Sequence, residues 1–307
     1  MTSPNANVEP AEHEHGIAAP GFRLPAATRI GTVRLQIADL DRSIAYYEGV
    51  LGLRVLDSES KRASLGTVTG DRVLLELIET KGVHPVPRRG RLGLFHFAIL
   101  LPSRADLGRF VAHLSAIGAH AGSSDHLVSE ALYLSDPDGL GIEVYADRPR
   151  SEWKYTGREI AMATIPLNLS DLVAAGGGQP WVGMPNGTTI GHVHLHVGDL
   201  DAAASFYHEA LGFDKVVWGY PGALFLSAGG YHHHLGTNTW AAGAPAATDD
   251  DARLIEWELV VPDASHVAQA AASVERSGGA IARAPNGTVL VRDPWGTAVR
   301  LVADVSS

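Results

Sequence analysis

The 307-residue sequence contains no cysteine. Disulfide bonds and thiolate metal sites are therefore excluded, and any metal ion must be held by nitrogen and oxygen ligands. The sequence also lacks an apolar run of about eighteen residues, the length that a membrane-spanning helix needs. Its polar, proline-containing beginning, MTSPNANVEPAEHEHG, lacks the basic and apolar regions of a signal peptide. We therefore expect a cytoplasmic protein that does not enter a membrane.

Basic residues are scarce, because 24 lysines and arginines stand against 34 aspartates and glutamates, which gives a formal net charge of −10. No dense basic cluster offsets this charge, so nucleic acid is not an expected partner. A content of 45% hydrophobic and 19% charged residues is ordinary for a globular chain long enough for two domains. Fifteen histidines make a metal site of nitrogen and oxygen ligands worth seeking.

The two halves of the chain resemble each other. The segment GTVRLQIADLDRSIAYYEGVLGLRV from Gly31 matches GHVHLHVGDLDAAASFYHEALGFDKV from Gly191, including an Asp-Leu-Asp helix start and a tyrosine at Tyr47 or Tyr207. Such an internal repeat changes the prediction for the whole fold.

A second pair of units follows within the halves. HFAILLPSRADLGRFVAHL matches EWELVVPDASHVAQAAASV, and SDPDGLGIEVYAD matches RDPWGTAVRLVAD. The pattern of each unit predicts a strand, then an amphipathic helix that begins after an Asp or Ser, and then further strands. The pattern predicts four units, which start near residues 30, 94, 190 and 253.

The repeat also predicts how the chain is divided. We expect a mobile tail over residues 1–27, with His13 and His15 solvated, and a first domain of two units over residues 28–148. A linker with three consecutive glycines at 176–178 would span residues 149–188, and a second domain of two units would span residues 189–305.

The strand GHVHLHV places three histidines, His192, His194 and His196, on one face, because side chains alternate along a strand. If this face packed into the hydrophobic core, burial of the three imidazoles would cost free energy. The first of them stands six residues before the turn that precedes the helix. The four units carry the following residues at this position: Thr32, His96, His192 and Glu256.

The stretch DHLVSEALYLSDPDGLGIEVY holds a strong turn signal, Asp-Pro-Asp-Gly, between two predicted strands. Alternation places Glu143 and Tyr145 on one face of the second strand and Ile142 and Val144 on the other. A lone glutamate on such a face is most often solvated. A functional role therefore requires partners from elsewhere in the chain.

From about residue 28 onward, the chain resembles the vicinal oxygen chelate superfamily, whose βαβββ units pair to form a cleft around a metal ion. One stretch of the chain resembles the signature of type I extradiol ring-cleaving dioxygenases. The residues that match it are His126, Leu132, Tyr133, Asp136, Pro137, Gly139 and Glu143. Ser124 is a minor departure, because the family usually has glycine, asparagine, threonine or an aliphatic residue there. The phrases LFHFAILLP, SEALYLSDPDG and AGGYHHH further resemble two-domain bacterial catechol 2,3-dioxygenases.

The resemblance implies an α+β fold of four βαβββ units, the glyoxalase-like fold, arranged as two domains. It implies an iron(II) site formed by His96, His192 and Glu143. Two imidazoles and one carboxylate make the facial triad of non-haem iron oxygenases. Three coordination positions then stay open for the two oxygens of a catechol and for dioxygen. Manganese(II) is not excluded.

The resemblance also implies an acid-base histidine within the run YHHH. His232 matches it best, His234 on the same strand face is the alternative and a candidate for substrate binding, and His233 is expected to face away. His126 and Tyr133 match residues that hydrogen-bond the substrate oxygens. His194 and His196 are candidates for lining the cleft or for structural hydrogen bonds. We assign no role to His84, His113, His120, His208 and His266.

The implied activity is cleavage of catechol-type aromatic diols with O2 to hydroxymuconic semialdehyde-type products, a reaction of aromatic hydrocarbon catabolism. One alternative is a glyoxalase-like metal-dependent isomerase or thiol transferase, which usually needs four protein ligands with two acids. Another is a non-catalytic small-molecule binding protein, which needs no metal triad. The implied partners are a small aromatic diol and O2, and a homo-oligomer is possible.

The implied ligands are divided between the halves, because His96 and Glu143 belong to the second unit and His192 to the third. The second and third units must then pair around one cleft and the first and fourth around another, unless two chains of a dimer exchange units. In the second cleft we expect an ion pair between Arg300 and Glu256 to fill the ligand positions, with a solvated pair as the alternative.

Overall fold

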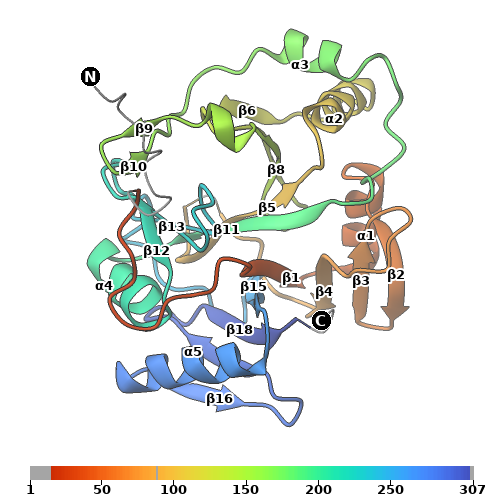
Figure 1. Cartoon of the computed structure of the whole chain (residues 1–307). Helices are drawn as coiled ribbons and strands as arrows, with labels where there is room; N and C mark the ends of the chain where they lie inside the picture. The colour runs from red at the N-terminus through yellow and green to blue at the C-terminus, as the bar shows by residue number, and fades with distance from the viewer. Residues whose placement is uncertain (1–14, 88, 305–307) are drawn as a thin grey trace, which may run out of the picture.

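The computed structural model describes residues 15–87 and 89–304. Its framework is two curled eight-stranded sheets with helices packed against them (Figure 1). No helix in the described part of the chain is long and apolar enough to cross a membrane.

The strands of the first sheet lie in the order β16 (Ile281–Arg283), β17 (Val289–Arg292), β18 (Ala298–Ala303), β15 (Arg253–Val261), β1 (Arg29–Ile37), β4 (Leu75–Glu79), β3 (Arg62–Gly66) and β2 (Arg54–Glu59). Those of the second sheet lie in the order β12 (Asp214–Val217), β13 (Ala223–Ser227), β14 (Leu235–Asn238), β11 (Thr189–His196), β5 (Gly93–Leu100), β8 (Gly141–Asp147), β7 (Ser129–Ser135) and β6 (Gly122–Asp125). The helices are α1 (Leu40–Gly49), α2 (Arg104–Ala116), α3 (Leu169–Ala175), α4 (Leu200–Ala204), η2 (Ser205–Ala210) and α5 (Ala264–Arg276).

Each sheet combines strands from both halves of the chain, as predicted. Strand β5 of the second unit pairs antiparallel with β11 of the third, and β1 of the first unit pairs antiparallel with β15 of the fourth. The second sheet therefore contains the second and third units, and the first sheet contains the first and fourth. One chain supplies both pairings, so no exchange of units between two chains is needed.

The helices begin where the sequence predicts. Each of the four repeated helices has an Asp or Ser N-cap whose side chain accepts a backbone N–H of the first turn: Asp39, Ser103, Asp199 and Asp263. Such a cap stabilises a helix by about 1 kcal/mol. The third of these helices differs from the others, because α4 continues as the π-helical turn η2.

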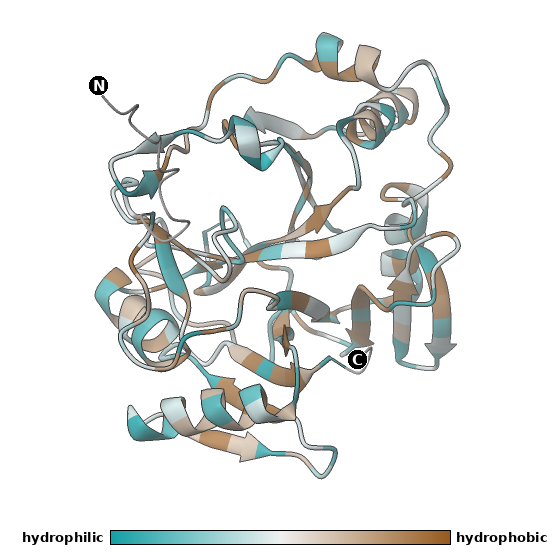
Figure 2. Ribbon diagram, in the orientation of Figure 1, coloured by the Kyte–Doolittle hydropathy of each residue, from teal (hydrophilic) through white to brown (hydrophobic). Residues whose placement is uncertain are grey.

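Alternation along β11 separates a core face from a polar face. Val193 and Leu195 are fully buried in the main hydrophobic core. The ribbon of β11 in Figure 2 accordingly alternates between hydrophobic and hydrophilic colours. The histidines of this strand are also buried, but they lie on the opposite face, outside the hydrophobic core.

The tyrosine shared by the two halves joins neighbouring units. The Tyr47 hydroxyl donates to Asp136 Oδ2 at 3.1 Å, and the Tyr207 hydroxyl donates to Asp293 Oδ2 at 2.9 Å. Both aspartates stand in the Asp-Pro turns that precede the last strand of a unit. The repeat therefore preserves a buried contact between the helix of one unit and the turn of the next.

Part of the predicted tail packs against the third unit, since Arg23 pairs with Asp214 at 2.6 Å. His15 is exposed, and its ring stacks on Tyr155 at 3.7 Å between centroids. The prediction for residues 1–14, including His13, lies outside the described residues.

The predicted linker, residues 149–188, crosses over the second sheet and carries short elements: η1 (Arg150–Glu152), β9 (Tyr155–Thr156), β10 (Glu159–Ile160) and α3 (Figure 1). Helix α3 packs so closely on α2 that a Cβ on Gly108 would lie 2.1 Å from the Leu172 carbonyl oxygen. Glycine is therefore required at this crossing. The division into domains at residues 28–148 and 189–305 stays a prediction.

Candidate metal centre and adjoining cavity

Three predicted ligands converge on the polar face of the second sheet. His96 lies on β5, Glu143 on β8 and His192 on β11, and each offers a ligand atom within 4.8 Å of the other two. The Nε2 atoms of His96 and His192 lie 2.9 and 3.2 Å from Glu143 Oε2. All three side chains are buried. The strands of two units thus bring together a triad that the chain order separates.

The donor atoms fit a divalent metal ion. Both ring nitrogens of His96 are buried without a hydrogen-bond partner, and so is Nδ1 of His192. His96 Nε2 lies close to Glu143 without the geometry of a hydrogen bond. An unpaired buried polar atom costs about 1–3 kcal/mol. A metal ion bound to the two Nε2 atoms and the carboxylate would satisfy the donors that face it.

The electrostatics also favour the ligand forms of these groups. Burial lowers the pKa of His192 to about 4, although the Glu143 carboxylate acts in the opposite direction. Burial acts to raise the pKa of Glu143, but His192 and His96 bring it well below the ordinary value. At neutral pH His192 is therefore a neutral imidazole and Glu143 an ionised carboxylate, which are the forms that bind metals.

The position that corresponds to Glu143 in the third unit is Gly236. On β8, Glu143 pairs with Ala98, which stands two residues after His96 on β5. On β14, Gly236 pairs with His194, which stands two residues after His192 on β11. A Cβ on Gly236 would lie 2.8 Å from the His194 ring, so the ring packs directly on this glycine. The site therefore offers three candidate protein ligands, and glycine stands at the fourth position.

A cavity of about 730 Å³ adjoins the triad. Its apolar wall includes Phe95, Phe225 and Trp240. Of the predicted site residues, His126, Tyr133, His194 and His196 line it, together with His96 and Glu143, whereas His232 and His234 do not. His120, to which we assigned no role, lies on the lining as well.

His126 and Tyr133 form a hydrogen-bonded pair at one side of the cavity. His126 Nδ1 lies 2.7 Å from the Ala163 carbonyl oxygen, which only accepts, so Nδ1 carries the proton. Nε2 then accepts from the Tyr133 hydroxyl at 2.5 Å. Burial and the charge of Glu143 raise the pKa of Tyr133 well above its ordinary value. Tyr133 thus stays protonated, and its oxygen keeps lone pairs for a bound hydroxyl group.

Asn238 joins the other two cavity histidines of β11. Its Oδ1 accepts the Trp240 backbone N–H at 3.1 Å, which fixes the orientation of the amide. Oδ1 also accepts from His196 Nδ1 at 2.7 Å, and Nδ2 donates to His194 Nε2 at 3.0 Å. Asn238 was not predicted as a site residue, although its spacing of two residues from Gly236 on β14 would place it on the cavity face.

The expected orientation of the three consecutive histidines is wrong. His233 lines the cavity, with its ring centroid 4.0 Å from that of His192. His232 is fully buried behind it, and His234 Nδ1 accepts the Ala228 backbone N–H. The reason is local: β14 begins only at Leu235, so these histidines precede the strand, in irregular chain where strand alternation does not apply.

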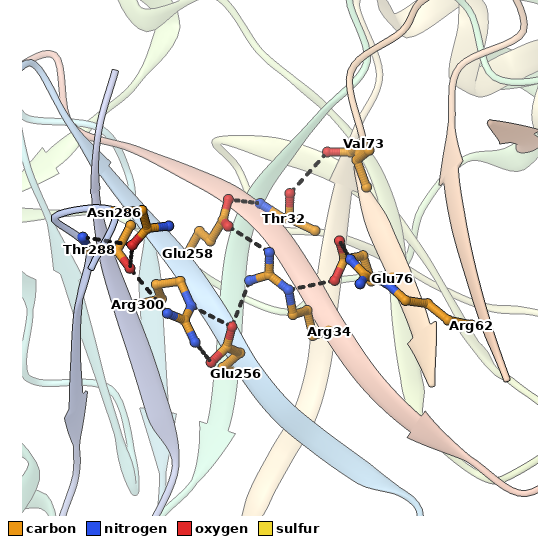
Figure 3. Close-up of polar contacts among 10 residues, drawn as sticks. All are labelled: Thr32, Arg34, Arg62, Val73, Glu76, Glu256, Glu258, Asn286, Thr288 and Arg300. Atoms are coloured by element: carbon orange, nitrogen blue, oxygen red, sulfur yellow. Dashed lines mark hydrogen bonds and ion pairs between the residues drawn. The ribbon is translucent and has the colours of Figure 1, made fainter. Parts of the chain in front are cut away.

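The corresponding region of the first sheet is filled by charged side chains (Figure 3). The predicted ion pair between Arg300 and Glu256 is confirmed, with two contacts of 2.6 Å. Arg34, at the position of His194, also contacts three carboxylates at 2.6–2.9 Å: Glu76, Glu256 and Glu258. A guanidinium therefore occupies the region of this sheet that corresponds to the candidate metal ligands of the second sheet.

Comparison with known proteins gives consistent results. The model of the Glyoxalase/Bleomycin resistance protein/Dioxygenase superfamily matches residues 29–144 and 189–301. A catechol-2,3-dioxygenase of Bacillus subtilis (strain 168) is 45% identical over 272 residues, 87% of this chain and 94% of that protein.

Two solved structures show the same fold. A candidate dioxygenase from Bacillus subtilis subsp. subtilis str. 168 has a TM-score of 0.64 and 12% identity, and the match covers 93% of this chain and 87% of that one. Glyoxalase I of Zea mays has a TM-score of 0.51 and 20% identity, and the match covers 90% of this chain and 92% of that one.

Proposed function

The chain belongs to the Glyoxalase/Bleomycin resistance protein/Dioxygenase superfamily, and we propose that it is an extradiol dioxygenase that opens catechol-type rings. The carbon–carbon bond beside the diol breaks, and both atoms of O2 enter the product, one in the new aldehyde and one in the new carboxylate. The product is a hydroxymuconic semialdehyde. The curated relative at 45% identity supports this reaction class.

The observation that carries the proposal is the three-ligand site with Gly236 at the fourth position. An isomerase or thiol transferase of this fold usually uses four protein ligands with two acids, and glycine offers none. A binding protein has no need for a buried triad in which three of the four imidazole nitrogens lack hydrogen-bond partners. Three ligands leave room for a chelating diol and for dioxygen together.

His96, His192 and Glu143 would hold iron(II), which would supply chelation of the two diol oxygens and binding of O2 beside them. The chain's own residues hold and orient the ring. Phe95, Phe225 and Trp240 offer an apolar wall, and the cavity of about 730 Å³ is large enough for a single substituted ring.

Two groups that line the cavity act on the hydroxyl protons of the substrate. Tyr133 accepts a hydrogen bond from a substrate hydroxyl while it donates to His126, which orients the diol. His233, the histidine of the YHHH run that lines the cavity, takes the place that we expected for His232 as the base and later the acid. Proton transfer of this kind contributes about 10²–10⁴-fold to a rate.

The test is anaerobic reconstitution with iron(II), followed by catechol and then air, while the yellow ring-opened product is monitored. We expect colour to develop with iron(II), and a parallel reconstitution with manganese(II) decides between the two metals. The absence of colour with every simple catechol would overturn the proposal and favour the isomerase or the binding protein.

A further inference from the structure

Behind the cavity, a chain of hydrogen bonds leads from His233 to the edge of the molecule. His233 Nδ1 lies 2.8 Å from His232 Nδ1, and His232 Nε2 lies 2.8 Å from Asp147 Oδ1. The side chain of His232 is completely buried, whereas that of Asp147, the last residue of β8, is 26% exposed. A cavity histidine is thus connected to a partly solvated carboxylate through one buried imidazole.

The chemistry of these atoms places the protons. An ionised carboxylate only accepts hydrogen bonds, so His232 Nε2 must donate to Asp147. The Nδ1 atom of a neutral His232 then has only a lone pair, and it accepts the proton carried by His233 Nδ1. In a neutral His233 the remaining nitrogen, Nε2, is left without a proton.

The free nitrogen of His233 opens toward the cavity. Among the described residues His233 Nε2 has no hydrogen-bond partner, and it is not one of the unpaired polar atoms sealed from solvent. Because His233 lines the cavity, the accessible surface of this nitrogen lies there. The connection to Asp147 therefore selects the tautomer that presents a lone pair to the substrate space.

The surroundings hold His232 in this orientation. Its ring packs against Tyr231 and Trp153, with centroid distances of 4.1 and 5.4 Å. The Tyr231 hydroxyl donates to Asp147 Oδ1 at 3.2 Å and pairs with the Tyr145 hydroxyl at 2.7 Å. These contacts fix the side chains of His232 and Asp147 behind His233.

The other sheet offers a contrast. Asp304 corresponds to Asp147 in the repeat, but its carboxylate pairs with Arg29 at 3.1 Å. Among the described residues, Asp147 contacts a histidine, whereas Asp304 contacts an arginine. The repeat alone therefore does not explain the connection.

We propose that Asp147 and His232 are positioning residues that fix the orientation and the tautomer of His233. This inference rests on the proposed function. Because His232 Nδ1 holds the Nδ1–H of His233, the lone pair of His233 Nε2 stays directed at the cavity in which the substrate would bind.

The first test reads the tautomer directly, without turnover. In metal-free protein labelled with ¹⁵N-histidine, nitrogen shifts of His233, assigned with His233→Phe, should show the proton on Nδ1. His232→Gln places an amide donor beside Nδ1, and the proton should move to Nε2. A wild-type His233 protonated on Nε2 would overturn the proposal, and it would do so whether or not the loaded protein cleaves catechols.

The second test uses the iron-loaded protein. His232→Gln should lower kcat about a hundredfold, with iron content and KM for catechol changed less than about threefold. His208→Gln is the matched control, because this buried histidine has no assigned role and does not line the cavity, and its kcat should stay within about threefold. Equal losses in the two variants would contradict the proposal.

Asp147→Asn keeps the proposal testable if His232→Gln does not fold, because position 147 is partly exposed. Removal of the charge should lower kcat about tenfold without loss of iron. An unchanged kcat in this variant would show that the carboxylate does not act on His233.

Discussion

Arg300 faces Glu256 with Nε and Nη2 each 2.6 Å from a different carboxylate oxygen. These two residues stand at the positions that Glu143 and His96 hold in the other sheet. The first sheet therefore holds a positively charged guanidinium in the region where the second sheet holds candidate ligands for a cation. Burial acts to raise the pKa of Glu256, but the Arg300 and Arg34 guanidinium groups bring it below its ordinary value. The carboxylate thus remains charged within the network.

Arg34→Leu should destabilise the protein by about 3–5 kcal/mol, because three carboxylates then lose the cation between them. Urea unfolding of metal-free protein measures this change. Arg62→Leu is the control, since Arg62 is 51% exposed and contacts only Glu76 of this network, and it should cost less than about 1 kcal/mol. Similar losses in the two variants would show that Arg34 is not the centre of the network.

His96→Ala, His192→Ala and Glu143→Ala should each abolish iron binding, because removal of one ligand from three leaves an ion that is poorly held. Metal analysis after anaerobic loading and desalting measures the occupancy. Thr32→Ala, at the position equivalent to His192 in the other sheet, should load normally. Near-stoichiometric iron in any ligand variant would remove that residue from the site.

Tyr133→Phe should keep its iron but lower kcat by about ten- to a hundredfold, because the hydroxyl that orients the diol is lost while the ring volume stays. Steady-state kinetics and metal analysis on the same sample separate the two effects. Tyr220→Phe is the matched control, since Tyr220 also lines the cavity but its hydroxyl pairs with Thr164. A Tyr133→Phe enzyme of full activity would contradict the assignment.

Asp136 should make stability depend on pH. Burial raises its pKa from 3.8 to about 6, in spite of hydrogen bonds from backbone groups and Tyr47. A carboxyl whose pKa is raised by folding binds more protons in the folded state, so stability falls as pH rises from about 4 to 6, by at most about 3 kcal/mol. Asp136→Asn should remove this slope, which urea titrations at several pH values measure. Parallel curves for the two proteins would contradict the shift.

Residues 1–150 and 180–307, produced separately, should each bind iron weakly and show no activity, because each sheet needs strands from both halves. Activity should return when the two fragments are mixed. Strong iron binding by either fragment alone would be incompatible with a triad divided between β5, β8 and β11.

The pairing of units and the candidate triad were predicted from the resemblance to the superfamily, which strong local patterns allowed us to map onto this chain. Alternation along GHVHLHV fixes which face its histidines share, and the Asp-Pro turn fixes the strand that carries Glu143. The division of ligands between the halves then requires the second and third units to meet. These steps need no knowledge of how the chain bends between elements.

The choice among the three consecutive histidines failed for the opposite reason. His232, His233 and His234 lie in irregular chain before β14, where the direction of each side chain depends on neighbours from other units. The tautomers in the cavity likewise depend on distant partners, such as Ala163 for His126 and Asp147 for His232. Local patterns contain no information on such contacts.

The composite sheets also determine the order of events during synthesis. Strands β1 and β5 leave the ribosome well before their partners β15 and β11, so their edges stay unpaired while the linker is still being made. Unpaired apolar edges on neighbouring nascent chains can join each other, which is a route to intertwined dimers and aggregates. An ion held by the candidate triad could be captured only after β11 has paired with β5, so we expect metal uptake to be a late event that reports correct closure of the chain.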